Sequence, residues 1–143
     1  MKAFTRSAYV VTVWLFVAGV ITQFILAGLA LFDTSRIWPV HVDVGFTIGY
    51  VLLLNVAFGL LGRLPRAAWG RLGMLFLLYV IQTILPSLRH VVPWIAALHP
   101  INAAIILWAG VAAARHARRY APKPVGIAES KSSASGIPEP DLA

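Results

Sequence analysis

Two histidines, each preceded by a glutamine, are the side chains of this sequence that could do chemistry together. Gln23 precedes His41 by eighteen residues, and Gln82 precedes His99 by seventeen. A neutral imidazole binds metals through a ring nitrogen, and glutamine is a strong hydrogen-bonding group. Both pairs lie in long apolar runs, where such groups are costly and tend to face the interior of a helix bundle. The pattern therefore predicts one polar layer that contains both imidazoles.

Small residues follow both histidines at helical spacing. Gly45 and Gly49 come four and eight residues after His41, and Ala103 comes four residues after His99. Residues at this spacing share one face of a helix, so the face beside each imidazole has room for a flat, bulky group. Haem b fits this pattern, because its iron takes one nitrogen from each side and its macrocycle needs small residues where helices pass its edges.

The available ligands limit the metal chemistry. Two histidines alone rarely complete a bare metal site, and the chain has no cysteine to supply a thiolate or attach a c-type haem. Arg36 and Arg89 lie in the two connections nearest the histidines, so they are the candidate partners of the haem propionates. No histidine lies in the opposite halves of the same helices, which predicts a single haem b per chain, with iron held by His41 and His99.

The composition indicates which elements position these residues. Hydrophobic residues make up 59 % of the 143 residues and charged residues 12 %, whereas soluble domains contain roughly 45–50 % apolar residues. We expect a polytopic membrane protein with helices at residues 8–32, 38–61, 72–85 and 94–114. The third helix could extend to residue 88 if a proline kinks it rather than ending it.

The two halves of the helical region repeat each other. Helices one and two carry the first glutamine and histidine, and helices three and four carry the second. Each histidine lies within about two turns of the same end of its helix, so the two share one depth. The predicted fold is an all-α, integral membrane four-helix bundle made of two repeated helix hairpins around a pseudo-two-fold axis normal to the membrane.

The distribution of the basic residues predicts the topology. Ten of the 12 lysines and arginines lie at the N-terminus, between helices two and three, or at the C-terminus. We therefore expect a bacterial cytoplasmic membrane protein with both termini cytoplasmic and the histidines in the outer-leaflet half. The net charge of +7 does not indicate nucleic acid binding, because no soluble stretch combines a basic patch with aromatic residues. Residues 1–119 form the predicted membrane domain, and residues 120–143 a disordered cytoplasmic tail.

The residues around the second histidine resemble a known family. Segment 81–85 followed by segment 96–104 is similar to one half-bundle of the haem A synthase family, in which a glutamine-led helix precedes a helix whose early histidine ligates haem. Segment 23–49 is similar at its glutamine, its histidine and Gly45. Residues 8–114 as a whole also resemble small four-helix bacterial membrane proteins and transmembrane b-type cytochromes. The resemblance implies haem ligation by the two histidines, but not synthase activity, because this chain has one bundle and one ligand pair.

These observations predict an electron-transfer protein rather than a substrate-converting enzyme, since nothing in the sequence marks a site of substrate oxidation. A quinone or an extracytoplasmic redox protein would be its partner. The alternative is a cofactor-free scaffold or accessory subunit of a larger membrane complex, in which the polar residues hold the helices together. A proton or small-molecule pathway is disfavoured, because the inner halves of the helices are almost entirely apolar beyond Asn55.

Overall fold

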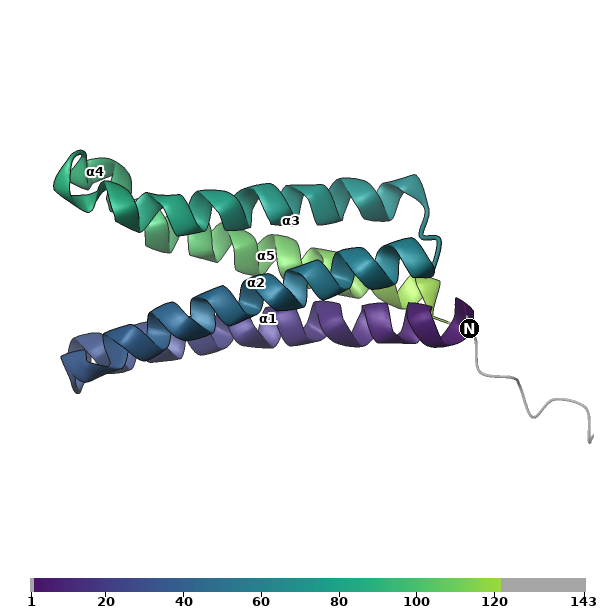
Figure 1. The fold of residues 1–143 in the computed structure, drawn as a ribbon, viewed down its shortest axis with the longest axis horizontal. Coiled ribbons are helices and arrows are strands. Elements are labelled where there is room, and N and C mark those ends of the chain that lie inside the picture. Colours follow the sequence, from purple (N-terminus) through teal and green to yellow (C-terminus); the bar gives the residue numbers. More distant parts are fainter. Residues whose placement is uncertain (1, 122–143) are drawn as a thin grey trace, which may run out of the picture.

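The computed structural model describes residues 2–121, and this part of the chain is helical throughout, without strands (Figure 1). The long helices are α1 (Lys2–Phe32), α2 (Trp38–Leu61), α3 (Arg66–Ile84) and α5 (His99–Ala117). The shorter helical segments are η1 (Ser35–Ile37), η2 (Leu85–His90), α4 (Pro93–Ala96) and η3 (Arg118–Tyr120). Within these described residues, four helical segments are long and apolar enough to cross a membrane, as the sequence predicted.

The helix boundaries follow backbone propensity more than hydropathy. The start and end of α2 are those predicted, but α1 and α3 begin at Lys2 and Arg66 rather than at residues 8 and 72. Lysine, arginine and alanine are good helix formers, so the helices continue into the charged segments that flank the apolar runs. The predicted tail lies outside the described residues, apart from Tyr120 and Ala121, and Tyr120 still belongs to η3.

Prolines shape the connection between α3 and α5. Beyond α3 the chain continues as the 3₁₀ segment η2, which contains Pro86. The fourth predicted helix is divided, because α4 ends at Ala96 and α5 begins at His99. Pro100 has no N–H to donate to the carbonyl of Ala96, so a continuous α-helix would lose a hydrogen bond there. The division makes His99 the first residue of its helix.

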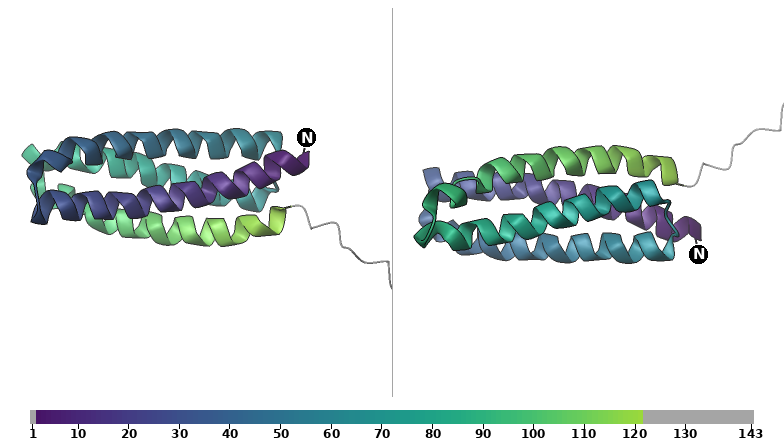
Figure 2. Two further views of the ribbon diagram at one scale, coloured as in Figure 1. Left: turned by 90° about the horizontal axis from the view of Figure 1, so that it is seen from below. Right: turned by 90° about the horizontal axis from the view of Figure 1, so that it is seen from above.

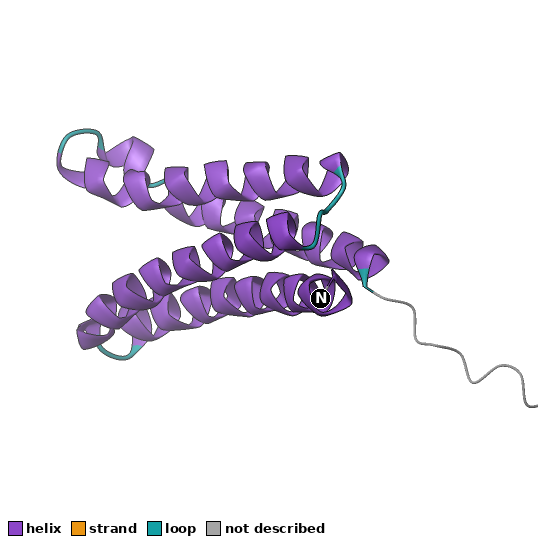
Figure 3. Cartoon of the chain, turned by 45° about the vertical axis from the view of Figure 1, so that its right-hand side comes forward, coloured by secondary structure: helices purple, strands orange, loops and turns teal. Residues whose placement is uncertain are grey.

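The helices form two hairpins that diverge along the bundle. α1 packs against α2, α3 packs against α5, and α1 and α5 join the hairpins (Figure 2). The hairpins lie close together at the end that holds both ends of the described chain, and they splay apart toward η1 and α4 (Figures 1 and 3). The largest fully buried side chains, Phe16, Leu52, Val13 and Asn55, lie in the tightly packed region. Small residues of α5 allow this close packing, and those buried there are Ala109, Gly110, Ala113, Ala114 and Ala117.

The two ends of the bundle differ in charge. One end, called the basic end below, carries Lys2, Arg6, Arg63, Arg66, Arg71, Arg115, Arg118 and Arg119. The opposite end, called the histidine end, contains η1, η2 and α4, and its cations are Arg36 and Arg89. The charge asymmetry seen in the sequence is therefore an asymmetry between the two ends of the folded molecule.

A buried polar contact joins α1 to α2 within the tightly packed region. The Thr12 hydroxyl donates to Oδ1 of Asn55 at 2.7 Å, and Nδ2 of Asn55 donates to the carbonyl of Val51 at 3.1 Å. Asn55 is only 1 % exposed. An amide buried this deeply needs partners within the protein, so this contact determines the register of the two helices.

We predict that Thr12→Val destabilises the folded protein by about 0.6 kcal/mol and at most about 1.7 kcal/mol, the range measured for interhelical hydrogen bonds in membranes. The matched control is Thr22→Val, because the Thr22 hydroxyl is exposed and donates only to Ala18 of its own helix. Reversible unfolding of both variants in mixed micelles measures the difference. Equal stability of the two variants would show that the Thr12 contact adds nothing.

Candidate functional site

The structure brings His41 and His99 together. His41 lies in the first turn of α2, and His99 begins α5, so the two imidazoles come from different hairpins. Their ring centroids are 6.3 Å apart, with the ring planes at 63°. Both side chains are half-buried. The shared depth and the convergence that the sequence predicted are therefore present in the fold.

His99 is held by Gln82 of α3 through both ring nitrogens. Nδ1 of His99 lies 3.1 Å from the backbone carbonyl of Gln82, and Nε2 lies 3.1 Å from the Gln82 side-chain nitrogen. A carbonyl only accepts and an amide nitrogen only donates, so this arrangement assigns the proton to Nδ1 and the lone pair to Nε2. Oε1 of Gln82 accepts a hydrogen bond of 2.7 Å from Asn102, which also donates to the carbonyl of Leu78.

The corresponding groups of the first hairpin are not satisfied in the same way. The Gln23 backbone carbonyl interacts with the ring of His41, but Nδ1 of His41 is buried without a hydrogen bond of regular geometry. The side-chain nitrogen of Gln23 is also buried without a partner. Each such group costs about 1–3 kcal/mol when it stays unpaired. The glutamine–histidine repeat thus has regular hydrogen bonds in the second hairpin, whereas two side-chain nitrogens of the first hairpin lack one.

The glycine face of α2 contacts side chains from both neighbouring helices. A Cβ on Gly45 would lie 3.7 Å from Oε1 of Gln23, which is an ordinary contact. A Cβ on Gly49 would collide with the ring of Tyr79, whose hydroxyl donates to the carbonyl of Gly45 at 3.1 Å. The flat group beside Gly49 is therefore a tyrosine ring from α3. Sequence reasoning missed Tyr79, although its place three residues before Gln82 in an apolar helix was a usable signal. Ala103 is half-buried on α5.

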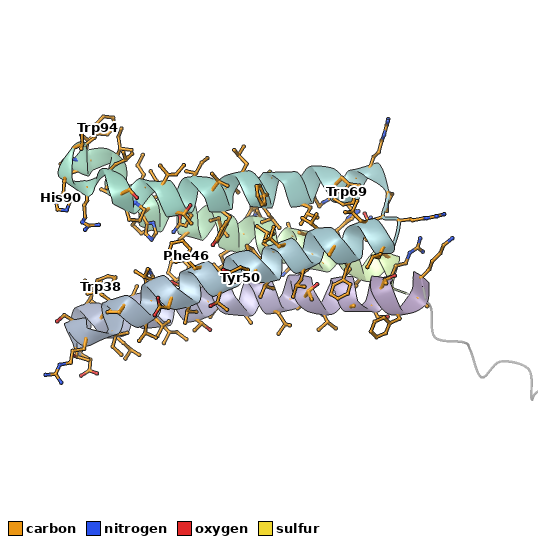
Figure 4. All side chains as sticks on the ribbon, in the orientation of Figure 1. Trp38, Phe46, Tyr50, Trp69, His90 and Trp94 are labelled. Carbon is orange, nitrogen blue, oxygen red and sulfur yellow. The ribbon has the colours of Figure 1, made fainter. Side chains whose placement is uncertain are left out.

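Aromatic and basic side chains surround the histidine end. Trp38 meets His41 edge-on at 5.6 Å between ring centroids, and Trp38, His90 and Trp94 all lie at this end (Figure 4). Arg36 in η1 and Arg89 in η2 are exposed at the same end. Arg36 and Arg89, which the sequence suggested as partners of haem propionates, therefore lie at the same end of the bundle as the two histidines.

An apolar pocket opens between α2 and α3, within two turns of the histidine layer. Its volume is about 320 Å³, and Phe46 and Tyr50 of α2, which are labelled in Figure 4, line it. The other lining residues are Gly49, Leu53, Phe76, Tyr79 and Val80. Within residues 2–121, no three histidine, cysteine, aspartate or glutamate side chains come together as a metal site. The histidine pair is the candidate donor set that the structure offers.

Comparison with known proteins gives a match to a protein family. Residues 23–88 match the model of a family described as a family of unknown function, DUF6220. The matched region is less than half of the chain; it contains Gln23, His41 and Gln82 and ends before His99. No curated protein and no solved structure matches the chain. The resemblance to haem A synthase and to b-type cytochromes therefore stays a prediction from the sequence.

We predict that Gly49→Ala is destabilising and Gly45→Ala is tolerated. The first substitution drives a methyl group into the Tyr79 ring and should cost about 1–3 kcal/mol as overpacking, whereas the second meets only the Gln23 side chain at ordinary contact distance. Thermal unfolding of both variants in detergent tests the difference. Gly28→Ala is the control, because nothing lies within 4 Å of its added methyl group. A Gly49→Ala variant as stable as that control would contradict the Tyr79 packing.

Proposed function

We propose that this chain is a membrane b-type cytochrome that binds one haem b between His41 and His99 and transfers electrons. The observation that supports this most directly is the 6.3 Å between the two ring centroids. Metal–imidazole bonds of about 2 Å, with each ring nitrogen about 1 Å from its ring centre, separate two ligands on opposite sides of a metal by roughly 6 Å. The imidazoles thus have a separation compatible with bis-histidine ligation.

The hydrogen bonds of His99 also favour a ligand role. Metal-binding histidines almost always donate their second ring N–H to a carbonyl or carboxylate, which sets the tautomer and the ring orientation. The Gln82 carbonyl does this for Nδ1, so Nε2 keeps its lone pair. Ligation at Nε2 requires the Gln82 amide to turn away and to give up the hydrogen bond that it accepts from Asn102, while the contact between Nδ1 and the Gln82 backbone carbonyl is kept. In the other hairpin, the side-chain nitrogens of His41 and Gln23 that lack a hydrogen bond are available to interact with a ligand.

In this proposal the protein provides ligation, orientation and a dry environment, and bound haem b supplies a one-electron carrier. His41 and His99 hold the iron, and Gln82 and Gln23 orient the two rings. Gly45 and Ala103 border the macrocycle, whereas the Tyr79 ring covers Gly49 and takes the place that the sequence assigned to the cofactor there.

Charge and topology extend the proposal to partners. Arg36 and Arg89 would neutralise the two propionates at the histidine end. With both termini cytoplasmic, that end faces outward in the cytoplasmic membrane of a bacterium. A membrane quinone or an extracytoplasmic redox protein is then the electron partner.

The second candidate is a cofactor-free scaffold or accessory subunit, and one observation favours it. Gln82 already hydrogen-bonds Nε2 of His99 and accepts from Asn102, which connects α3 to α5 without any ligand. Interhelical contacts of this kind hold membrane bundles together. The two candidates differ in what His41→Ala changes, because His41 has no hydrogen bond to lose at Nδ1.

We predict that the full chain, expressed in a haem-replete host, carries about one haem per chain and shows a six-coordinate b-type spectrum when reduced with dithionite. His41→Ala and His99→Ala should each lose most of this haem, since each removes one of the two iron ligands. Haem per chain and the reduced-minus-oxidised spectrum are the measurements.

His90→Ala and His116→Ala are the matched controls, because these are the other two of the four histidines and lie outside the pair. Both controls should keep a full complement of haem. A colourless wild-type protein would contradict the cytochrome proposal and favour the scaffold. Equal haem retention in all four variants would exclude His41 and His99 as ligands.

We predict that single cysteines at Ser35 and Ser87 react with a membrane-impermeant maleimide in bacterial spheroplasts, whereas one at Ala3 reacts only after lysis. The chain has no cysteine, so each label reports one position. Ser35 and Ser87 are exposed at the histidine end, and Ala3 is exposed at the basic end. The reverse labelling pattern would contradict the topology but would leave the ligand assignment untouched.

A further inference from the structure

We propose that the basic end contains a specific site for an anionic phospholipid, with the lipid phosphate between Lys2 and Arg63. The site lies at the opposite end of the bundle from the histidine pair, and it does not depend on the proposed function. It rests on a pocket, on the contacts that build it and on an unusual backbone conformation.

The pocket combines cations with apolar walls. It has a volume of about 460 Å³ and lies between the start of α1 and the end of α2. Its lining residues are Lys2, Phe4, Thr5, Leu61 and Arg63. Phe4 is 73 % exposed and Leu61 is 63 % exposed, so these apolar side chains can contact a ligand. Two cations beside two apolar side chains match a phosphate that is attached to acyl chains.

Contacts between α1 and the α2–α3 turn hold the two sides of the pocket together. Nε of Arg6 donates to the carbonyl of Gly62 at 3.2 Å. A Cβ on Gly62 would lie 3.4 Å from Cγ of Arg6 and 3.6 Å from the Thr5 hydroxyl oxygen, so α1 packs closely on the turn. Lys2 and Arg63 therefore face one pocket as a consequence of tertiary packing, although they are far apart in the sequence.

Arg63 occupies a backbone position that ordinarily suits glycine. Its φ is 50°, and no other non-glycine residue of the described chain has a positive φ. The N–H of Leu64 donates to the carbonyl of Gly59 at 3.1 Å, which closes the end of α2 in the manner of a left-handed helix cap. Glycine adopts this conformation at lower cost, yet the chain places its glycine one residue earlier and an arginine here. Strain of this kind at a charged residue is a reason to look for a role of the charge.

The location of the pocket favours a lipid over free phosphate. The basic end caps four apolar helical segments, so it lies where lipid headgroups meet water. Clustered basic residues at that depth attract anionic lipids. Free inorganic phosphate would interact with the two cations but would make no apolar contact with Phe4 and Leu61. A phospholipid and inorganic phosphate both present a phosphate group to the two cations. The apolar walls of the pocket favour the phospholipid, because only its phosphate is attached to acyl chains.

Native mass spectrometry of the full chain in non-ionic detergent tests this site. The probes are phosphatidylglycerol and phosphatidylcholine with the same acyl chains, and inorganic phosphate is added as a competitor. We expect one phosphatidylglycerol per chain to bind more tightly than phosphatidylcholine and to resist millimolar inorganic phosphate. Lys2→Gln and Arg63→Gly should each weaken phosphatidylglycerol binding about fivefold, since each removes one charge at the phosphate.

Arg63→Gly should fold normally, because glycine adopts the left-handed backbone conformation of this position at low cost. Circular dichroism should therefore show unchanged helix content. Arg63→Lys should retain most of the binding. Arg119→Gln is the matched control, since it removes an exposed charge at the same end outside the pocket. Equal binding of the two lipids, or an equal loss in Arg119→Gln, would overturn the site in favour of diffuse attraction. Displacement of phosphatidylglycerol by inorganic phosphate would overturn the assignment to a lipid.

Discussion

Polar side chains inside an apolar bundle must find partners within that bundle, and this constraint divides the structure into two regions. Toward the basic end, Thr12 and Asn55 satisfy each other, and the surrounding core is apolar and closely packed. Toward the histidine end the hairpins diverge, and His41 of one hairpin lies near His99 of the other. Gln82 hydrogen-bonds His99 within the second hairpin. The first region holds the helices together. The second contains the candidate functional site.

The internal repeat is symmetric in sequence and asymmetric in hydrogen bonding. Gln82 satisfies both ring nitrogens of His99 and is itself satisfied by Asn102. Gln23 and His41 each retain a buried nitrogen without a partner. A bundle that served only to join helices would gain stability by pairing these groups, because each unpaired group has a desolvation cost. This asymmetry adds to the separation of the two imidazoles as support for the proposed ligand between the histidines.

The two proposed sites use opposite ends of the molecule and different physical chemistry. At the histidine end, two half-buried imidazoles lie beside the Trp38 ring, and the proposed ligand there is a haem. At the basic end, Lys2 and Arg63 face a pocket with apolar walls, and packing of Arg6 against Gly62 holds it in place. Loss of either site should leave the other intact, since the two sites lie at opposite ends of an elongated bundle (Figure 1).

The sequence by itself determined the helices and the depth of the histidines. Apolar runs, prolines and flanking charges are local signals, so the bounds of α2 and the all-α class followed from them without knowledge of any contact. The shared depth of His41 and His99 followed from helix geometry and from the hairpin repeat. Only the tertiary structure decided that Tyr79 covers Gly49, that Gln82 sets the tautomer of His99, and that Lys2 and Arg63 share a pocket. Each of these depends on a side chain from another helix, and the spacing of residues along one helix does not specify which neighbour it will meet.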